Sequence, residues 1–285
     1  MAKHNPSLAL TLEPVDTNQT PLIDVRPAAD FAAGHPFAAT NIPLEIIEGS
    51  WHELPPKGAR LKLLCNFKQQ TNLKQIFEKQ NYHVSDILIA EQLDQQDWLQ
   101  GNLSQRLWQA SPLLEQHIEL IKDQLTTESP LVFDVGSGSG RDSVFLALHG
   151  FKAMAFDNNH YALDRLENFS DKHKANIQAV NLDFQAQLEE FKSLLKQHKP
   201  QLVMQARYLH RPLLDLYDQY LPNGAMVAIH TFTQAAAEFG KPKNPAYLLQ
   251  DNELAHKFSD WNILLNQEHK LADGRPLSMF LAQKP

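Results

Sequence analysis

Short apolar runs alternate with amphipathic stretches along almost the whole chain, and groups of turn residues separate them. The apolar runs predict strands at 21–25, 60–65 and 85–90, and then at 131–135, 152–156, 176–181, 201–205, 225–231, 261–268 and 277–283. Helices are predicted at 28–33, 44–52, 73–80, 112–125, 142–149 and 251–258, and in the remaining gaps up to Gly224. This alternation predicts an α/β fold with parallel sheets covered on both faces by helices.

The alternating pattern falls into two halves. A polar stretch at 101–104 follows the last helix of the first half, and Pro112 suits the first position of a helix that opens the second half after Ser111. We therefore predict a smaller domain at 1–105 and a larger one at 106–285. Each is long enough to bury a core of its own.

The strand at 131–135 ends in a glycine-rich turn. Three glycines, two residues apart, follow Asp134, and a predicted helix begins directly behind them. Glycine allows backbone angles and close ligand approach that a side chain would block. The next strand ends at Asp157 and Asn158, where a carboxylate can accept hydrogen bonds from two ribose hydroxyls. A nucleotide-like ligand is therefore expected against this turn and the helix N-terminus.

The spacing of the glycines distinguishes between cofactors. A dinucleotide fingerprint would place its third glycine at Arg141, and a phosphate loop would need Gly-Lys-Ser/Thr, which is absent. The sequence Asp-x-Gly-x-Gly-x-Gly at 134–140 instead resembles motif I of class I S-adenosylmethionine-dependent methyltransferases. The resemblance runs from about Pro112 to the end of the chain. Gly-Arg-Asp-Ser at 140–143 and the residues at 145–151 are most similar to the branch that contains tellurite-resistance methyltransferases.

This resemblance implies a Rossmann-like, seven-stranded methyltransferase domain with S-adenosylmethionine as its cofactor. Asp134 suits the cationic methionyl group, and Asp183 with Phe184 stands where the family binds the adenine, although an ordinary strand-ending turn is the alternative there. Gln205 ends the fourth strand and is expected at the same crevice. The residues expected to bind the cofactor are Asp134, Gly136, Ser137, Gly138, Gly140, Arg141, Asp157, Asn158, Asp183, Phe184 and Gln205.

The segment behind the fourth strand is expected to bind the methyl acceptor. It carries Arg207, Tyr208, His210 and Arg211, and Thr231 ends the next strand. A proline-rich insertion at 239–245 has the character of a lid. Cationic side chains beneath a lid favour a small acceptor that is anionic or electron-rich. Pairing of the two arginines with carboxylates across the sheet is the alternative.

Methyl transfer from a sulfonium mainly requires alignment of the reacting atoms and exclusion of water. A base is needed only where the acceptor is protonated at neutral pH. His210 is our candidate for that role, with His230 and Tyr208 as further candidates. A thiolate or another soft anion would need no base.

The first half contains three short motifs, which are Ile-Asp-Val-Arg-Pro at 23–27, Gly-His at 34–35 and Asn-Ile-Pro at 41–43. Together they resemble the opening of a rhodanese-like domain, which implies a small parallel sheet. Cys65 stands where rhodaneses hold a persulfide. The family's loop usually has a glycine and an arginine after the cysteine, but residues 66–70 contain neither. A loop without glycine is less able to turn its N–H groups toward one anion. We expect a degenerate domain that docks a protein partner or sets the oligomeric state.

Composition and charge narrow the classes of partner. The net charge is −7, with −4 in residues 1–105 and −3 in 106–285, which disfavours nucleic acid and membrane surfaces. No run approaches the ~20 apolar residues of a membrane span, and residues 1–6 lack the apolar core of a signal peptide. Cys65 is the single cysteine, which fits a reducing cytoplasm. No spacing among the 13 histidines predicts a metal site.

The sequence leaves three functions open. The first is methyl transfer to a small, soft or anionic acceptor beside a degenerate rhodanese-like domain. The second is a bifunctional sulfurtransferase and thiol methyltransferase that uses a Cys65 persulfide. The third is a tRNA or protein methyltransferase, which the acidic charge of both halves disfavours.

Overall fold

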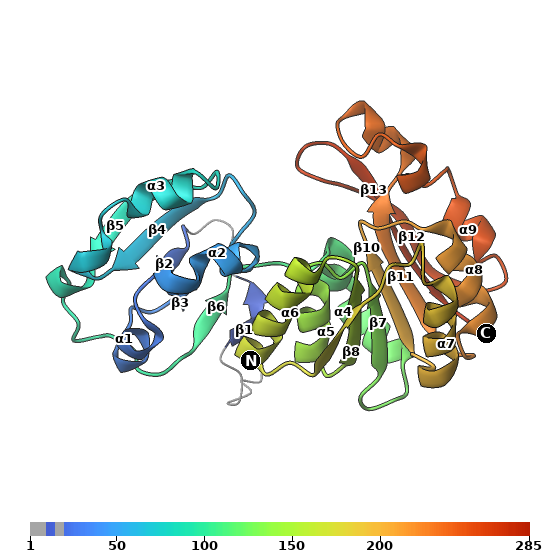
Figure 1. Ribbon diagram of the computed structural model, residues 1–285, viewed down its shortest axis with the longest axis horizontal. Coiled ribbons are helices and arrows are strands. Elements are labelled where there is room, and N and C mark those ends of the chain that lie inside the picture. The colour runs from blue at the N-terminus through green and yellow to red at the C-terminus, as the bar shows by residue number, and fades with distance from the viewer. Residues whose placement is uncertain (1–9, 15–19) are drawn as a thin grey trace. The chain divides into compact units, whose positions relative to one another are not determined.

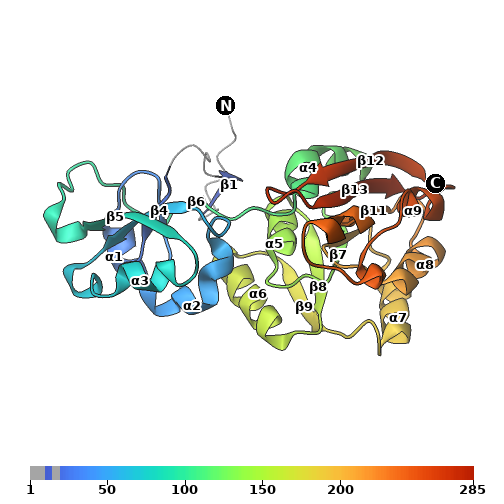
Figure 2. The same ribbon diagram turned by 90° about the horizontal axis from the view of Figure 1, so that it is seen from above.

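A computed structural model describes residues 10–14 and 20–285. The chain forms two compact units that divide between Gln109 and Ala110, and both have the α/β architecture predicted from the sequence (Figures 1 and 2). The division lies four residues beyond the predicted boundary between 105 and 106. Leu107 packs into the core of the first unit, so this short connecting segment goes with the first unit.

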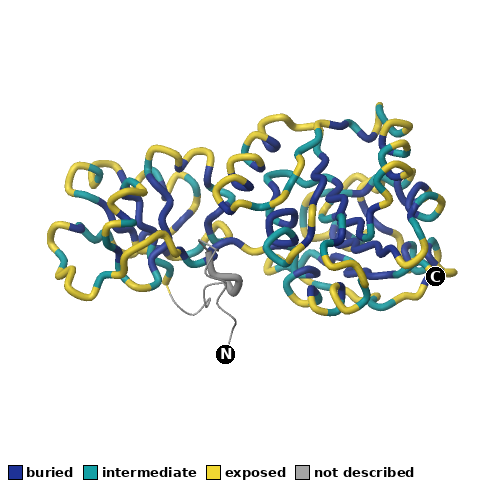
Figure 3. The backbone as a smooth tube through the Cα atoms, turned by 90° about the horizontal axis from the view of Figure 1, so that it is seen from below, coloured by how far each residue is buried: buried dark blue, intermediate teal, exposed yellow. Residues whose placement is uncertain are grey.

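The first unit is built on a four-stranded parallel sheet in the order β3-β2-β4-β5. Its strands are β2 (Leu22–Asp24), β3 (Ala39–Asn41), β4 (Arg60–Cys65) and β5 (His83–Ile89), and a separate parallel pair joins β1 (Leu10–Pro14) to β6 (Ser104–Arg106). The helices are α1 (Ala28–Ala33), α2 (Ile47–Ser50) and α3 (Leu73–Glu78), with 3₁₀ turns η1 (Leu44–Ile46), η2 (Trp51–Glu53), η3 (Phe67–Gln69) and η4 (Ala90–Gln92). Figure 3 shows buried stretches of backbone in the interior of this unit, with exposed stretches around them.

Two predictions for the first unit are corrected by the structure. The helix expected at 44–52 divides into η1, α2 and η2. Strand β3 was not predicted, because its three residues, Ala-Thr-Asn, are too few and too polar to give an apolar run. Tertiary pairing with β2 forms it instead.

The second unit contains a seven-stranded sheet in the order β12-β13-β11-β10-β7-β8-β9, which confirms the expected strand number. The strands are β7 (Leu131–Val135), β8 (Lys152–Asp157), β9 (Ile177–Asn181), β10 (Leu202–Ala206), β11 (Met226–Phe232), β12 (Asn262–Lys270) and β13 (Pro276–Gln283). The helices are α4 (Pro112–Gln124), α5 (Arg141–Leu148), α6 (His160–His173), α7 (Leu188–His198), α8 (Arg211–Tyr220) and α9 (Glu253–Lys257), with 3₁₀ turns η5 (Gln234–Glu238) and η6 (Pro245–Tyr247).

The expectation of an all-parallel sheet is wrong at β13, which runs opposite to the other six strands. β13 pairs antiparallel with both β11 and β12. Only residues 271–275 connect β12 to β13, and a parallel connection would need a crossover of a dozen or more residues. The sheet is therefore mixed.

The strand order reverses at β7, which positions the functional site. The chain runs from β7 outward through β8 and β9, then returns to the other side of β7 for β10 and β11. The loops behind β7 and β10 therefore diverge, and a crevice is expected outside the carboxyl ends of these two strands. Within residues 10–14 and 20–285, no helix has the length and apolar character needed to cross a membrane.

Candidate functional site

The glycine turn lies between β7 and α5 and is held against β8. Gly136, Gly138 and Gly140 all adopt positive φ angles, of 75°, 55° and 82°. The N–H groups of Gly136 and Ser137 donate to the carbonyl of Phe156 over 2.9 and 3.0 Å. A Cβ atom at Gly138 would meet nothing within 4 Å, so the middle of the turn has open space beside it.

Asp157 ends β8 and fixes this turn from the other side. Its Oδ2 accepts a hydrogen bond from Gly138 N–H at 2.9 Å, and its Oδ1 accepts from Asn159 N–H at 2.9 Å. An ionised carboxylate has about four lone-pair sites, so two bonds leave room for further donors such as ribose hydroxyls. Asp157, which is predicted to bind the ribose, therefore lies next to the turn and can accept further hydrogen bonds.

A hollow of about 170 Å³ lies at the carboxyl ends of the strands. It is lined by Gly136, Asp157, Asn158, Leu182, Asp183, Phe184, Ala206, Arg207 and Tyr208. Five of these nine were expected to bind the cofactor and two to bind the acceptor, and the structure brings them together from the loops behind four strands. Leu182 and Ala206 were not singled out in the sequence, because small and aliphatic residues at strand ends carry no distinct signal.

Aromatic side chains form one wall of the hollow. The ring of Tyr208 lies 5.8 Å from that of Phe184, which packs 5.0 Å from Phe191 in the core. Burial, together with the carboxylates of Asp183 and Asp157, raises the pKa of Tyr208 to about 12, so the phenol stays protonated. Tyr208 contributes an apolar surface and a neutral hydroxyl. Its assignment to the acceptor stays a prediction.

Asp134 and Asp142 are buried beneath the turn. Asp134 Oδ2 accepts the hydroxyl hydrogen of Ser143 at 2.5 Å, and Asp142 Oδ1 accepts from Ser111 N–H at 2.6 Å. Burial raises the pKa of both carboxyl groups, and Asp142 raises that of Asp134 further. A bound cation would favour the ionised form of Asp134. Its expected role beside a methionyl group therefore stays a prediction.

Gln205 and Arg211 make their polar contacts inside the fold. Gln205 is fully buried, its Nε2 donates to the carbonyl of Tyr208 at 2.9 Å, and its Oε1 accepts from Tyr217. Arg211 donates through Nε and Nη2 to both oxygens of Glu253, at 2.6 and 2.9 Å. Gln205 thus fixes the backbone at Tyr208. Arg211 pairs with a carboxylate, which was the alternative to binding the acceptor.

Arg207 differs from Arg211 in having no such partner. Its side chain is exposed and makes no hydrogen bond or ion pair with any residue that the structure describes. Its backbone lies in the left-handed region at φ 53°, with its N–H donating to the carbonyl of His230 at 2.7 Å. Strained backbone of this kind costs about 1–3 kcal/mol and is concentrated at functional sites.

Three further predicted residues, His210, Thr231 and Arg141, do not line the hollow. His210 precedes α8, and burial lowers its pKa while Asp183 opposes that shift. Thr231 is buried in β11. Arg141 begins α5 directly behind the glycine turn. No group of three or more His, Cys, Asp or Glu side chains in the described part of the chain could hold a metal ion.

Two backbone N–H groups of the loop behind Cys65 already donate hydrogen bonds to side chains of the protein. The N–H of Phe67 donates to both carboxylate oxygens of Glu91, at 3.2 and 3.1 Å, and that of Asn66 donates to Gln69 Oε1. Cys65 itself is fully buried. Burial raises the pKa of its thiol, and Glu91 and Asp24 raise it further. This environment disfavours a reactive thiolate.

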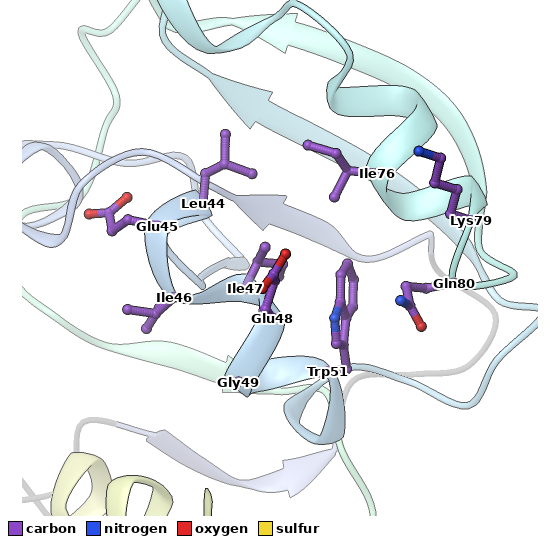
Figure 4. Close-up of a pocket in the computed structure, with 10 residues that line it drawn as sticks. All are labelled: Leu44, Glu45, Ile46, Ile47, Glu48, Gly49, Trp51, Ile76, Lys79 and Gln80. Atoms are coloured by element: carbon purple, nitrogen blue, oxygen red, sulfur yellow. The ribbon is translucent and has the colours of Figure 1, made fainter.

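A larger groove, of about 680 Å³, lies on the first unit between the η1–α2 segment and α3. Figure 4 shows Leu44, Ile47, Trp51 and Ile76 along it, with Glu48 beside Ile47 and Lys79 beyond Ile76. Neither Cys65 nor its loop lines this groove. It is therefore separate from the position that a persulfide would occupy.

Comparison with known proteins identifies the two units. Residues 109–272 match the family model "Tellurite resistance protein TehB", and residues 7–89 match the rhodanese-like domain. A relative in Schizosaccharomyces pombe, "Uncharacterized protein UNK4.09", is 22% identical over 316 residues that cover 92% of this chain and 93% of its own.

Three of the solved structures with similar folds show the range of similarity. TehB from Haemophilus influenzae has a TM-score of 0.49 and 19% identity over 62% of this chain, and the match spans 64% of the Haemophilus chain, which is less than two thirds of its length. A methyltransferase from Methanosarcina mazei has a TM-score of 0.44 and 18% identity, covering 62% of this chain and 98% of its own. Magnesium protoporphyrin IX methyltransferase from Synechocystis has a TM-score of 0.44 and 13% identity, covering 60% of this chain and 78% of its own.

The TehB model matches more than half of the chain. The protein therefore belongs to the TehB family of S-adenosylmethionine-dependent methyltransferases and carries a rhodanese-like domain at its N-terminus.

Proposed function

We propose that this enzyme transfers the methyl group of S-adenosylmethionine to a small, soft, anionic acceptor. The cofactor would lie along the glycine turn, with its ribose on Asp157 and its adenine near Asp183 and Phe184. The acceptor would enter beside Arg207, at the end of β10. The assignment of the individual residues is part of the proposal.

The observation that carries this proposal is the unpaired guanidinium of Arg207. It lines the same hollow as Asp157 and Asp183, makes no hydrogen bond or ion pair with any described residue, and stands on strained backbone. A cation in that position can hold an anion against the crevice. The name of the matching family, a tellurite resistance protein, is compatible with a chalcogen acceptor.

A screen of acceptors tests the proposed function directly. Calorimetric titration with S-adenosylmethionine and S-adenosylhomocysteine first establishes cofactor binding. Formation of S-adenosylhomocysteine is then measured with hydrosulfide, hydroselenide, 2-mercaptoethanol and acetate. We expect turnover with the soft anions and none with acetate. Turnover with a transfer RNA or a protein alone would contradict the proposal.

Replacing Arg207 with alanine should reduce kcat/KM for the true acceptor by about 10- to 100-fold, because a hydrogen bond to a charged partner contributes about 1.5–3 kcal/mol. Cofactor affinity in calorimetry should change by less than about twofold. Arg60→Ala, which removes an exposed arginine from β4, is the matched control and should leave both values unchanged. Equal loss of cofactor affinity and turnover in Arg207→Ala would contradict the role in acceptor binding.

We also propose that the rhodanese-like domain does not transfer sulfur. Glu91 takes the Phe67 N–H, and the buried thiol has a raised pKa, so a persulfide anion at Cys65 would lack the donors and the exposure it needs. The domain would instead bind a protein partner or a second copy of the chain. The cytoplasmic location expected from the sequence stays part of this proposal.

The second candidate function, coupled sulfur transfer and thiol methylation, depends on Cys65. Cys65→Ser should leave methyl transfer unchanged, and native wild-type protein should react with iodoacetamide at least about 10-fold more slowly than the unfolded chain, because burial withholds the thiolate. Mass spectrometry of the alkylated peptide measures this. Thiosulfate:cyanide activity that disappears in Cys65→Ser would instead support the bifunctional enzyme.

A further inference from the structure

His230 lies one strand away from the wall of the hollow. It stands near the carboxyl end of β11 and pairs in register with Ala206 of β10, which lines the hollow. Paired residues on adjacent strands project their side chains to the same face of a sheet, about 4.8 Å apart. Asp134 faces the same side, since it pairs with Met204, two residues before Ala206. The His230 side chain therefore stands beside the crevice on its β11 side.

The imidazole of His230 has no hydrogen-bond partner. The residue is fully buried, and neither Nδ1 nor Nε2 bonds to any group among the described residues. Its nearest aromatic neighbour is His269, with ring centroids 5.6 Å apart in an edge-on arrangement. Buried polar side chains are nearly always hydrogen-bonded, so an orphaned one beside a ligand site points to a missing ligand group.

The neighbours of His230 keep its ring uncharged. Burial, together with the charges of His269 and Arg207, lowers the pKa of His230 to about 3. A neutral imidazole offers one N–H donor and one accepting nitrogen. A ring that protonates only in strong acid is a poor base at neutral pH. His230 is therefore not the base that removes a proton from the acceptor, and its role is that of a hydrogen-bonding group.

We propose that His230 donates a hydrogen bond to the anionic methyl acceptor, which it holds together with Arg207. The two residues are joined directly, since the carbonyl of His230 accepts the N–H of Arg207. An uncharged donor next to an exposed cation fits a small monoanion better than a dianion, for which a second cation would be expected. This inference rests on the proposed function and narrows its substrate class to small monoanions.

Hydrosulfide is the simplest acceptor of that class. Its sulfur forms a bond to the methyl carbon while the bond from that carbon to the sulfonium sulfur breaks, and the electron pair of the broken bond stays on S-adenosylhomocysteine. The anion and the sulfonium cation thus give two uncharged products at the reacting atoms, methanethiol and a thioether. No proton has to leave the acceptor, which agrees with a neutral His230.

Steady-state kinetics with sodium hydrosulfide test the role of His230. We expect His230→Phe to raise the KM for hydrosulfide about 10-fold or more with less than about threefold change in kcat, because a donor to the acceptor is lost. His230→Gln, which restores an N–H donor, should recover most of this loss. His173→Phe is the control, because it replaces a buried histidine at the C-terminal end of α6, and α6 packs against β9 at the opposite edge of the sheet.

Calorimetry with S-adenosylhomocysteine and ¹⁵N NMR of the histidine rings complete the test. Cofactor affinity should stay within about twofold of wild type in every variant. The His230 ring should be neutral from pH 5 to 8, and its ¹⁵N resonances should shift when hydrosulfide is added to the S-adenosylhomocysteine complex. Methanethiol formation with an unchanged KM in His230→Phe would overturn the role of His230 alone. No methanethiol from the wild-type enzyme would overturn the acceptor class, and with it the proposed function for this anion.

Discussion

Replacing Asp157 with alanine is expected to weaken S-adenosylmethionine binding by about 10- to more than 100-fold, or about 1.5–3 kcal/mol. Two effects combine. The carboxylate that would accept the ribose hydroxyls is removed, and Gly138 N–H loses the partner that holds the glycine turn. Isothermal titration calorimetry with S-adenosylmethionine measures the loss.

Two further variants separate these effects. Asp157→Asn keeps one oxygen for Gly138 N–H but is a weaker acceptor for ribose, so it should bind the cofactor between alanine and wild type. Asp164→Ala removes an exposed carboxylate from α6 and should not change affinity. Gly138→Val, which fills open space in the turn, should also lose binding. Normal affinity in both Asp157→Ala and Gly138→Val would show that the cofactor lies elsewhere.

Much of the fold could be predicted because local patterns determine it. The limits of α1, β4 and β7 agree with the prediction residue for residue, since each is a clear amphipathic or apolar run between turn residues. Strand direction, in contrast, is not determined by the local pattern. The apolar pattern of β13 does not say whether it runs parallel or antiparallel to β11, and only the short connection at 271–275 carries that information.

The candidate site shows the same division between local and long-range information. Gly136, Gly138 and Asp157 could be chosen from the sequence, because turn, strand end and spacing are local features. The pairing of Arg211 with Glu253 could not be predicted from the sequence, since Glu253 lies 42 residues away. Two arginines four positions apart therefore looked alike in sequence, and tertiary contacts separate the paired Arg211 from the unpaired Arg207.

The Cys65 loop shows a contact that the sequence alone does not reveal. The missing glycine and arginine predicted a weak anion site. The structure adds Glu91, 24 residues beyond Phe67, whose carboxylate accepts from the loop. A glutamate in a distant turn has no sequence signal for that role, because many exposed glutamates look the same along the chain.

Gly140→Ala should be the most destabilising small substitution in the methyltransferase unit. Gly140 has φ +82°, and an added Cβ would lie 2.6 Å from Leu166 Cγ and 2.9 Å from its Cδ1. Leu166 is fully buried with Ala155 and Leu163, so it has little room to move. Overpacking together with an unfavourable φ should cost about 2–4 kcal/mol of unfolding free energy.

Gly150→Ala is the matched control for backbone strain. Gly150 also has a positive φ, of 95°, but nothing lies within 4 Å of an added Cβ, so we expect a loss of only about 1–2 kcal/mol. Hydrogen exchange followed by mass spectrometry on peptides from β7 and β8 measures both losses within the second unit. The difference between the two variants isolates the contact with Leu166. Equal losses would mean that α6 can move away from the glycine turn, and the close packing that fixes this turn for the cofactor would then be refuted.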